Sequence, residues 1–316
     1  MHPFKPVLIS VFLCIAYSTT VFGQNFRREV GIQNDNDVYL MTLQDQYYTN
    51  GINFFFRQAI DSSKYAQKFT KKLWTINIGH KIYNAYNGAV ETASEIDRPL
   101  TGYLYVRGEL QWHTKKEEVI SVGAEIATIG DWAFGEKLQT NFHRFFGFYD
   151  ISGWEYELNH SSGVDLRASY ASLLFRNKAK NIDALINGNL SLGSNNTRIS
   201  VSPNVRLGRI NSLSESAIMG SRPQSEFRKL DSEFYFYYRP QINFIVYNST
   251  IQGGLFIDDK GPITYGARPW VLSQMVGLQF ATDRFGINFN YTFNTKEVKS
   301  LAEAHQYGSL NFSYYF

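Results

Sequence analysis

Apolar and polar residues alternate strictly along many segments of this chain. In segment 284–293 every second residue is apolar: Phe285, Ile287, Phe289, Tyr291 and Phe293. The same period of two occurs in segments 103–112, 120–126 and 309–316. Side chains that alternate in this way lie on opposite faces of a β-sheet. The pattern predicts a chain built mainly of β-strands.

The residue types on the two faces decide between a soluble sandwich and a membrane barrel. A sandwich buries Val, Ile and Leu on its inner faces, whereas the apolar face here is rich in aromatic residues. The chain has 21 Tyr and 25 Phe, yet its mean hydropathy is only −0.28. Its polar face carries charges that a dry core would exclude: Arg107, Glu109, Glu125, Arg239 and Arg284. Lipid outside and a hydrated lumen inside account for both faces. We therefore expect an all-β, transmembrane antiparallel β-barrel.

Turn-bounded runs of about ten residues give a barrel of about 12 strands. They fall near 26–36, 48–58, 72–80, 100–113, 117–129, 162–174, 180–192, 197–208, 230–247, 269–281, 284–295 and 305–316. An even number places both ends of the barrel chain at the periplasmic side. Long connections are then extracellular, at 41–47, 80–99, 130–160 and 248–269. The connection 209–229 is long where a short periplasmic turn is expected, and the sequence explains it only as a periplasmic loop.

The connection 130–160 does not alternate and is predicted to be a helical insertion in an extracellular loop. In segment 135–148 apolar residues recur at helical spacing: Leu138, Phe142, Phe145 and Phe146. His143 lies among them. Polar insertions on a rigid scaffold often carry chemistry. A single His is weak evidence, however, and His143 filling a loop helix is an equally good interpretation.

The first 23 residues are typical of a secretory signal peptide. Lys5 precedes a short apolar run that ends at the small residue Gly23, and the run is short for a membrane-spanning helix. We therefore expect residues 1–23 to be removed after export and residues 24–316 to form one outer-membrane barrel. The only cysteine, Cys14, lies in the removed segment, so disulfides, zinc thiolates and a cysteine nucleophile are excluded.

The charge balance of the expected mature chain gives no reason to predict a nucleic-acid partner. The removed segment contains one Lys and no acidic residue, which leaves 30 basic and 28 acidic side chains. No basic run that would bind nucleic acid is present. The last residue, Phe316, resembles the terminal aromatic by which the barrel assembly machinery recognises outer-membrane barrels.

Two short motifs are candidates for chemistry. Segment 34–37 reads NDND and offers only oxygen donors, which suit calcium better than zinc. The same residues also suit a polar turn closed by Asx side chains, and an EF-hand's glycine and closing glutamate are absent. His160 and Ser162 form an H-x-S arrangement that a serine hydrolase on a barrel strand would use. No third orienting residue stands out beside them.

Several ordered motifs resemble the outer-membrane lipid A 3′-O-deacylase family. They span nearly the whole mature chain: DNDVY at 35–39, YTNG at 48–51, DRP at 97–99, GYLY at 102–105, G-E-x-x-Q-x-x-x-H at 135–143, GW at 153–154, RLG at 206–208, Asn248 with GGLF at 253–256, TKE at 295–297 and YGSL at 307–310. The chain departs from the family where Glu157-Leu158 replaces Gln-Leu. It departs again where Asn159-His160-Ser161 replaces Asn-Glu-Pro.

This resemblance implies a twelve-stranded barrel that removes the 3′-linked acyloxyacyl group of lipid A by calcium-dependent hydrolysis. It implies that Asn36 and Asp37 are Ca²⁺ ligands and that His143 is the base. Asp150 matches the acid expected after that His, where the family usually has Glu. The substrate is lipopolysaccharide in the outer leaflet.

Two cationic residues of the insertion, Arg144 and Lys137, are expected to meet the lipid A phosphates or to be solvated charges. We expect a monomer that contacts outer-membrane lipid. Two rival functions remain open: a phospholipase-type barrel that depends on His160 and Ser162, and a non-enzymatic porin or transport barrel. Large and charged lumen residues slightly disfavour the porin.

Overall fold

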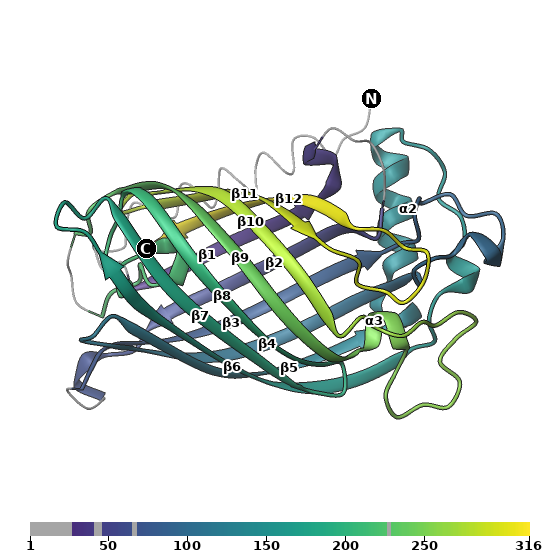
Figure 1. The fold of residues 1–316 in the computed structure, drawn as a ribbon, viewed down its shortest axis with the longest axis horizontal. Coiled ribbons are helices and arrows are strands. Elements are labelled where there is room, and N and C mark those ends of the chain that lie inside the picture. The colour runs from purple at the N-terminus through teal and green to yellow at the C-terminus, as the bar shows by residue number, and fades with distance from the viewer. Residues whose placement is uncertain (1–26, 41–45, 65–67, 226–228) are drawn as a thin grey trace.

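The protein forms a closed barrel of twelve antiparallel strands (Figure 1). This computed structural model describes residues 27–40, 46–64, 68–225 and 229–316, so the expected signal peptide lies outside the described residues. Each strand pairs with its neighbours in the sequence, and β1 pairs with β12 to close the cylinder. The predicted fold class is confirmed.

The predicted strand count is confirmed, and the observed bounds differ from the predicted ones by a few residues. The strands are β1 (Arg28–Asn36), β2 (Tyr48–Ala59), β3 (Phe69–Tyr83), β4 (Thr101–Thr114), β5 (Glu118–Ile129), β6 (Ser161–Arg176), β7 (Ile182–Gly193), β8 (Asn196–Arg209), β9 (Glu233–Asn248), β10 (Trp270–Ala281), β11 (Phe285–Asn294) and β12 (His305–Tyr315). β3 extends three residues beyond the prediction at each end. Its added ends include Lys71 and Lys81. A hydrated lumen tolerates these charged side chains, so a prediction based on apolar residues ended the strand too early at both ends.

Apolar side chains face outward and polar side chains face the lumen. In β5, Ile126 is 63% exposed, whereas Glu125 is 2% exposed and lines the lumen. Alternation of this kind suits a cylinder surrounded by hydrocarbon and filled with polar groups. Small apolar clusters, rather than one large core, hold the loops. In the part of the chain that the structure describes, no helix combines the length and apolar character needed to cross a membrane.

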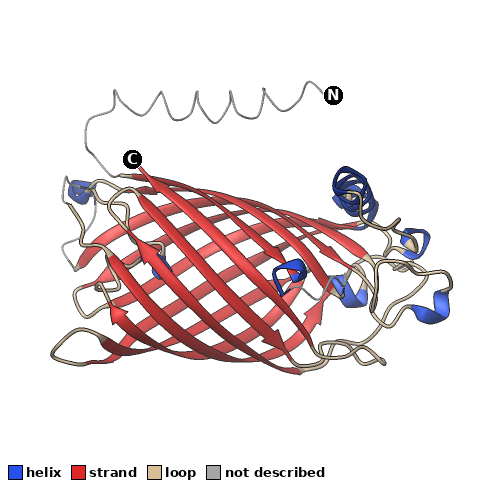
Figure 2. Cartoon of the chain, turned by 90° about the horizontal axis from the view of Figure 1, so that it is seen from above, coloured by secondary structure: helices blue, strands red, loops and turns tan. Residues whose placement is uncertain are grey.

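Five long connections share one end of the barrel, because antiparallel strands alternate in direction. This end, called the loop end here, carries 37–47, 84–100, 130–160, 249–269 and 295–304. The helices at this end are η2 (Asp37–Leu40), η4 (Ala93–Glu95), η5 (Gly130–Ala133), α2 (Gly135–Phe146), η6 (Trp154–Tyr156) and α3 (Ser249–Gln252). Figure 2 shows most of the helices grouped at this end. The predicted helix in the 130–160 insertion is thus present as α2.

The unexplained connection between β8 and β9 folds into the lumen at the opposite end, the turn end. We call its described residues, 210–225 and 229–232, the plug; it includes η7 (Ala217–Met219). Lys71 of β3 donates to the carbonyl oxygens of Ser214 and Ser221 at 2.5 Å each. Gln111 of β4 donates to the carbonyl oxygen of Met219 at 2.9 Å. Residues 217–220 line the lumen, so the expectation of a simple periplasmic loop was wrong about where this segment lies.

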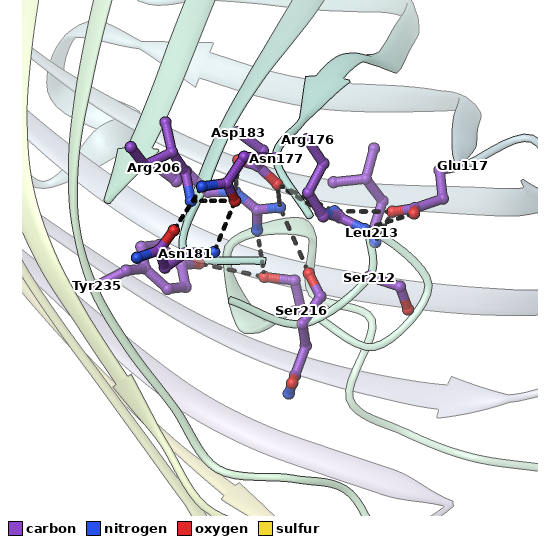
Figure 3. A network of polar contacts seen from close by, with 12 residues as sticks. Glu117, Arg176, Asn177, Asn181, Asp183, Arg206, Ser212, Leu213, Ser216 and Tyr235 are labelled. Carbon is purple, nitrogen blue, oxygen red and sulfur yellow. Dashed lines mark hydrogen bonds and ion pairs between the residues drawn. The ribbon is translucent and has the colours of Figure 1, made fainter. Parts of the chain in front are cut away.

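A buried polar network anchors the plug to the barrel wall (Figure 3). Arg206 Nη1 donates to Ser216 Oγ of the plug at 2.9 Å, and both residues are fully buried. Glu117 accepts from the backbone N–H of plug residue Leu213 at 2.9 Å. The length of the β8–β9 connection is therefore explained by the distance it spans across the inside of the barrel.

Candidate functional site

The end of β1 presents two buried oxygen-bearing side chains. Asn36 is 8% exposed and Asp37 is 5% exposed. Asn36 Oδ1 accepts from the N–H of Val38 at 2.7 Å, which is an Asx turn. Asp37 Oδ2 accepts from the N–H of Gln46 at 3.0 Å. The turn interpretation therefore describes part of what these residues do.

Helix α2 turns its polar side to the protein. Its buried residues are Gly135, Gln139 and His143, which recur every fourth residue and so share one face. The apolar residues that predict the helix are exposed: Leu138 49%, Phe142 41%, Phe145 81% and Phe146 56%. A helix beside hydrocarbon can hold its apolar side outward at no cost. This orientation suits a segment at the membrane surface.

Close packing fixes the position of α2 on the barrel. A Cβ on Gly135 would lie 2.6 Å from the Trp154 ring and 2.9 Å from the Gly102 backbone nitrogen, so only glycine fits there. Trp154 Nε1 donates to Gln139 Oε1 at 3.1 Å. These contacts join η6 and β4 to the face of α2 that carries His143.

His143 is held in one tautomer by the chain that follows the helix. Gly147 ends α2 with φ +72°, and the chain returns so that the Tyr149 carbonyl lies 2.9 Å from His143 Nδ1. A carbonyl oxygen only accepts, so Nδ1 must carry the proton. Nε2 is then the nitrogen with the lone pair, which is the form that a general base requires. Phe148 and Tyr149 pack edge-on against the ring.

The buried His and the buried oxygens lie at the same rim. η2 packs against β12 and β2, while α2 packs against β3 and β4. Since β2 and β3 are adjacent, the two elements are neighbours around the loop end. Neighbouring strands are ~4.8 Å apart, so β1 and β3 are separated by roughly 10 Å.

The other predicted site residues lie at the surface. Asp150 is exposed, and so are Lys137 and Arg144 on α2. The Lys137 ammonium lies 5.6 Å from the centre of the Phe134 ring. The structure thus brings Asn36, Asp37 and His143 to one rim and leaves Asp150 outside the buried group.

The donor set fits calcium in part. Among the described residues, no three His, Cys, Asp or Glu side chains gather to hold a metal ion. Asn36, Asp37 and the adjacent buried Thr49 offer only hard oxygen atoms, which calcium prefers. Calcium takes six to eight oxygens, so backbone carbonyls and water would have to complete its shell.

Glu157 is a titratable residue at the loop end. It was not among the candidate site residues predicted from the sequence. Its Oε1 accepts from the N–H of Gly102 at 3.1 Å. Burial, with smaller contributions from Asp131 and Glu136, raises the pKa of Glu157 to about 7. The signal was its departure from the Gln that the resembling family has at this position.

The H-x-S pair does not form a hydrolytic dyad in this structure. His160 stacks on Trp132 with ring centres 4.2 Å apart, and its Nδ1 lies 3.4 Å from Asp131 Oδ1. His160 and Ser162 are exposed, and no hydrogen bond joins these two described residues. The geometry gives no support to a phospholipase built on this pair.

The fold and the site together define an outer-membrane β-barrel with a helical insertion at one rim that buries a histidine. The chain belongs to the family described as outer membrane protein LpxR, whose model matches residues 7–316. Among solved structures, LpxR from Salmonella typhimurium superimposes with a TM-score of 0.73 at 16% identity, covering 91% of this chain and 100% of that one. That identity supports the shared fold alone.

Weaker matches include the β domain of the Bordetella autotransporter BrkA, with a TM-score of 0.48 and 9% identity over 92% of this chain and 99% of that one. The translocator domain of the autotransporter NalP from Neisseria meningitidis matches with a TM-score of 0.46 and 7% identity over 98% of this chain and 95% of that one. No curated protein matches the chain.

Proposed function

We propose that this protein removes the 3′-linked acyloxyacyl group of lipid A by calcium-assisted hydrolysis, with His143 as the base. One observation carries the proposal: His143 is buried at the loop-end rim, with Nδ1 donating to the Tyr149 carbonyl, near the buried oxygens of Asn36 and Asp37. Membership of the LpxR family and the motifs quoted above support lipid A as the substrate.

The proposed roles of these residues follow from the two barriers to ester hydrolysis, a weak nucleophile and an unstable negative charge on the ester oxygen. Water is a poor nucleophile, and His143 Nε2 would take its proton as it attacks the ester carbonyl, an effect typically worth about 10² to 10⁴ in rate. Asn36 and Asp37 would hold calcium, with Asp150 contributing only if its loop moves inward. A bound calcium ion supplies Lewis acidity that stabilises negative charge on the ester oxygen.

The outer surface of α2 would position the lipid. Exposed Phe145 and Phe146 would contact acyl chains, while Lys137 and Arg144 would meet phosphates. A site at the rim can receive a lipid of the outer leaflet without removing it from the membrane. The proposal places the protein in the outer membrane, where the barrel assembly machinery would insert it. It would act as a monomer, since one chain closes the barrel and supplies the proposed base and calcium ligands.

Mass spectrometry of lipid A from cells that express wild type or His143→Ala tests this function. We expect wild type to yield lipid A that lacks the 3′ acyloxyacyl group, and His143→Ala to yield intact lipid A. His160→Ala is a matched control in the same insertion, and it should behave as wild type. Deacylation by His143→Ala would remove that residue from its role. Loss of activity in His160→Ala would favour the phospholipase-type site.

A further inference from the structure

The lumen contains a group of cationic side chains that the proposed hydrolysis does not use. A cavity of about 740 Å³ occupies the lumen. Lys81, Arg107, Arg167 and Arg198 line it, together with carboxylates that include Asp35, Glu109 and Glu125. Glu125 Oε2 lies 2.7 Å from Arg107 Nε and 3.7 Å from Arg167 Nη1. Arg198, by contrast, forms no ion pair with any residue that the structure describes, so positive charge remains on this part of the wall.

Three of the lining residues form one row across adjacent strands. Arg167 of β6 pairs with Ser191 of β7, and Ser191 pairs with Arg198 of β8. All three line the cavity. The backbone positions of the two arginines are therefore about 10 Å apart, two strand spacings. Guanidinium groups on side chains of this length can converge on one small molecule in front of Ser191.

Two residues of this row have polar side-chain groups without a hydrogen-bond partner among the described residues. Arg198 makes no hydrogen bond or ion pair with any residue that the structure describes. Ser191 is 2% exposed, and its Oγ has no hydrogen-bond partner within the described ranges. Buried polar groups normally have partners, so an unused hydroxyl between two arginines is a feature that a ligand would explain.

Arg198 also acts electrostatically on Lys81 and Arg167, which places the three cations near one another. Asp35 also acts electrostatically on Lys81, but its carboxylate already accepts from Tyr48 Oη at 2.7 Å. Like charges gathered in a lumen repel one another. An anion among them removes that repulsion.

Both ends of the lumen restrict the size of the ligand. The plug lies inside the turn end. At the loop end, Asp97 accepts from Tyr47 Oη at 2.7 Å, and its carbonyl accepts from Ser300 Oγ at 2.5 Å. Arg98 next to it donates to Thr250 at 3.1 Å. Four loops thus meet over the mouth, so the cavity suits a small, hydrated anion better than an acylated lipid.

We propose that Arg167, Ser191 and Arg198 form a binding site for a phosphate-class oxyanion inside the barrel, separate from the hydrolytic rim. Arginine presents a planar, two-pronged donor that matches phosphate oxygens, and the serine hydroxyl supplies a third donor. The phosphate is either free in solution or carried by the headgroup of a lipid that reaches the mouth.

The test uses the full barrel, refolded in detergent and carrying His143→Ala so that hydrolysis does not interfere. Titration calorimetry with inorganic pyrophosphate at fixed ionic strength measures binding to this protein and to Arg198→Gln and Arg167→Gln versions. We expect saturable binding that weakens at least tenfold in each Gln version. Ser191→Ala should weaken it by a smaller factor.

Arg239→Gln is the matched control, because it removes one positive charge from the same lumen. Arg239 lies on β9, where its Nη2 contacts the Met275 sulfur at 3.2 Å. Binding to this version should stay within twofold. Heat-modifiable migration on gels shows that every version is folded.

A second titration uses phosphorylated lipid A in mixed micelles. Tenfold weakening in the pyrophosphate titration identifies a site for free phosphate. Weakening confined to the lipid titration identifies a lipid-borne phosphate at the same residues. Absence of saturable binding in both titrations, or equal weakening by Arg239→Gln and Arg198→Gln, overturns the proposal. Both titrations measure binding, so their results do not depend on whether the rim hydrolyses lipid A.

Discussion

Arg206 and Asp183 form a two-pronged ion pair inside the barrel wall. Arg206 Nε lies 2.8 Å from Asp183 Oδ1, and Arg206 Nη2 lies 2.6 Å from Asp183 Oδ2. Neither side chain has exposed surface. Arg176 Nη2 also lies 3.0 Å from Asp183 Oδ2, so one carboxylate holds two guanidinium groups beside the plug. Figure 3 shows how these contacts continue to Ser216.

Asp183→Ala is expected to destabilise the barrel strongly, because it leaves the fully buried Arg206 without its carboxylate, whereas Arg176 keeps its pair with Glu117. Removing one partner of a buried pair typically costs about 3–5 kcal/mol. Urea-dependent unfolding, followed by gel migration, measures the loss. Lys178→Ala, at an exposed turn nearby, should change the free energy of unfolding by less than about 0.5 kcal/mol. Equal stability of the two variants would contradict the role given to this pair.

The plug predicts that the barrel does not conduct ions. In a planar bilayer, wild type should show no steady current at moderate voltage, since residues 217–220 occupy the lumen. Deleting residues 214–222 should produce open-channel steps. A stable wild-type conductance that the deletion leaves unchanged would restore the porin as a candidate function.

Gly135→Ala is expected to abolish most deacylation while the barrel stays folded. The new methyl group would meet the Trp154 ring at 2.6 Å, so α2 and its His143 must move away from the rim. Gly108→Ala is the matched control, because its Cβ would meet no atom within 4 Å. Lipid A mass spectra and gel migration distinguish the two effects. Full activity of Gly135→Ala would mean that the position of α2 is not critical.

Glu157 predicts a pH-dependent loosening of the 130–160 insertion. Its pKa is raised from 4.5 to about 7, so the folded insertion favours the neutral carboxyl. The stabilisation is therefore complete below about pH 4.5 and is lost as the pH rises through about 7. Amide hydrogen exchange in segment 130–160, corrected for the intrinsic pH dependence of exchange, should show protection that falls between pH 5 and 8.

Glu157→Gln should remove this pH dependence, because the amide does not titrate. Glu155→Gln, which changes an exposed carboxylate two residues away, should retain it. If corrected protection in wild type were constant from pH 5 to 8, the burial of Glu157 would have no effect on the insertion.

The apolar face of α2 points outward. We therefore expect the double substitution Phe145→Ser and Phe146→Ser to weaken binding of membrane-embedded lipid A. The half-saturating lipid concentration should rise several-fold with little change in maximal rate, since these rings lie away from His143's buried face. Leu301→Ser changes a residue that is 88% exposed on another loop, and it should have no effect. Equal kinetics for all three proteins would mean that these rings do not meet substrate.

The strands could be predicted because their environment repeats every two residues. Lipid on one side and polar groups on the other impose that period on segments such as 284–293. The plug could not be predicted, since several of its contacts are made by backbone groups, such as the carbonyls of Ser214 and Met219, which any sequence can offer. The end of β3 was missed because Lys81 faces a lumen where charge is tolerated.

The candidate site was predictable only as far as local motifs reach. The motifs located His143 and the oxygen donors Asn36 and Asp37, and the topology brings them to one rim. The hydrogen bond that sets the tautomer of His143 depends on the path of the chain after Gly147, which no motif records. The row of Arg167, Ser191 and Arg198 joins three strands, and its register exists only in the folded sheet.

The seam between β1 and β12 has a consequence for biogenesis. Arg28 and Phe316 exchange backbone hydrogen bonds of 2.8 and 2.9 Å, which unite the two most distant strands of the described chain. A ribosomal product that stops short of β12 keeps two unpaired edges that invite aggregation or attack by proteases. Quality control in the envelope can therefore distinguish finished from unfinished molecules by a single criterion, whether any strand still has a free side.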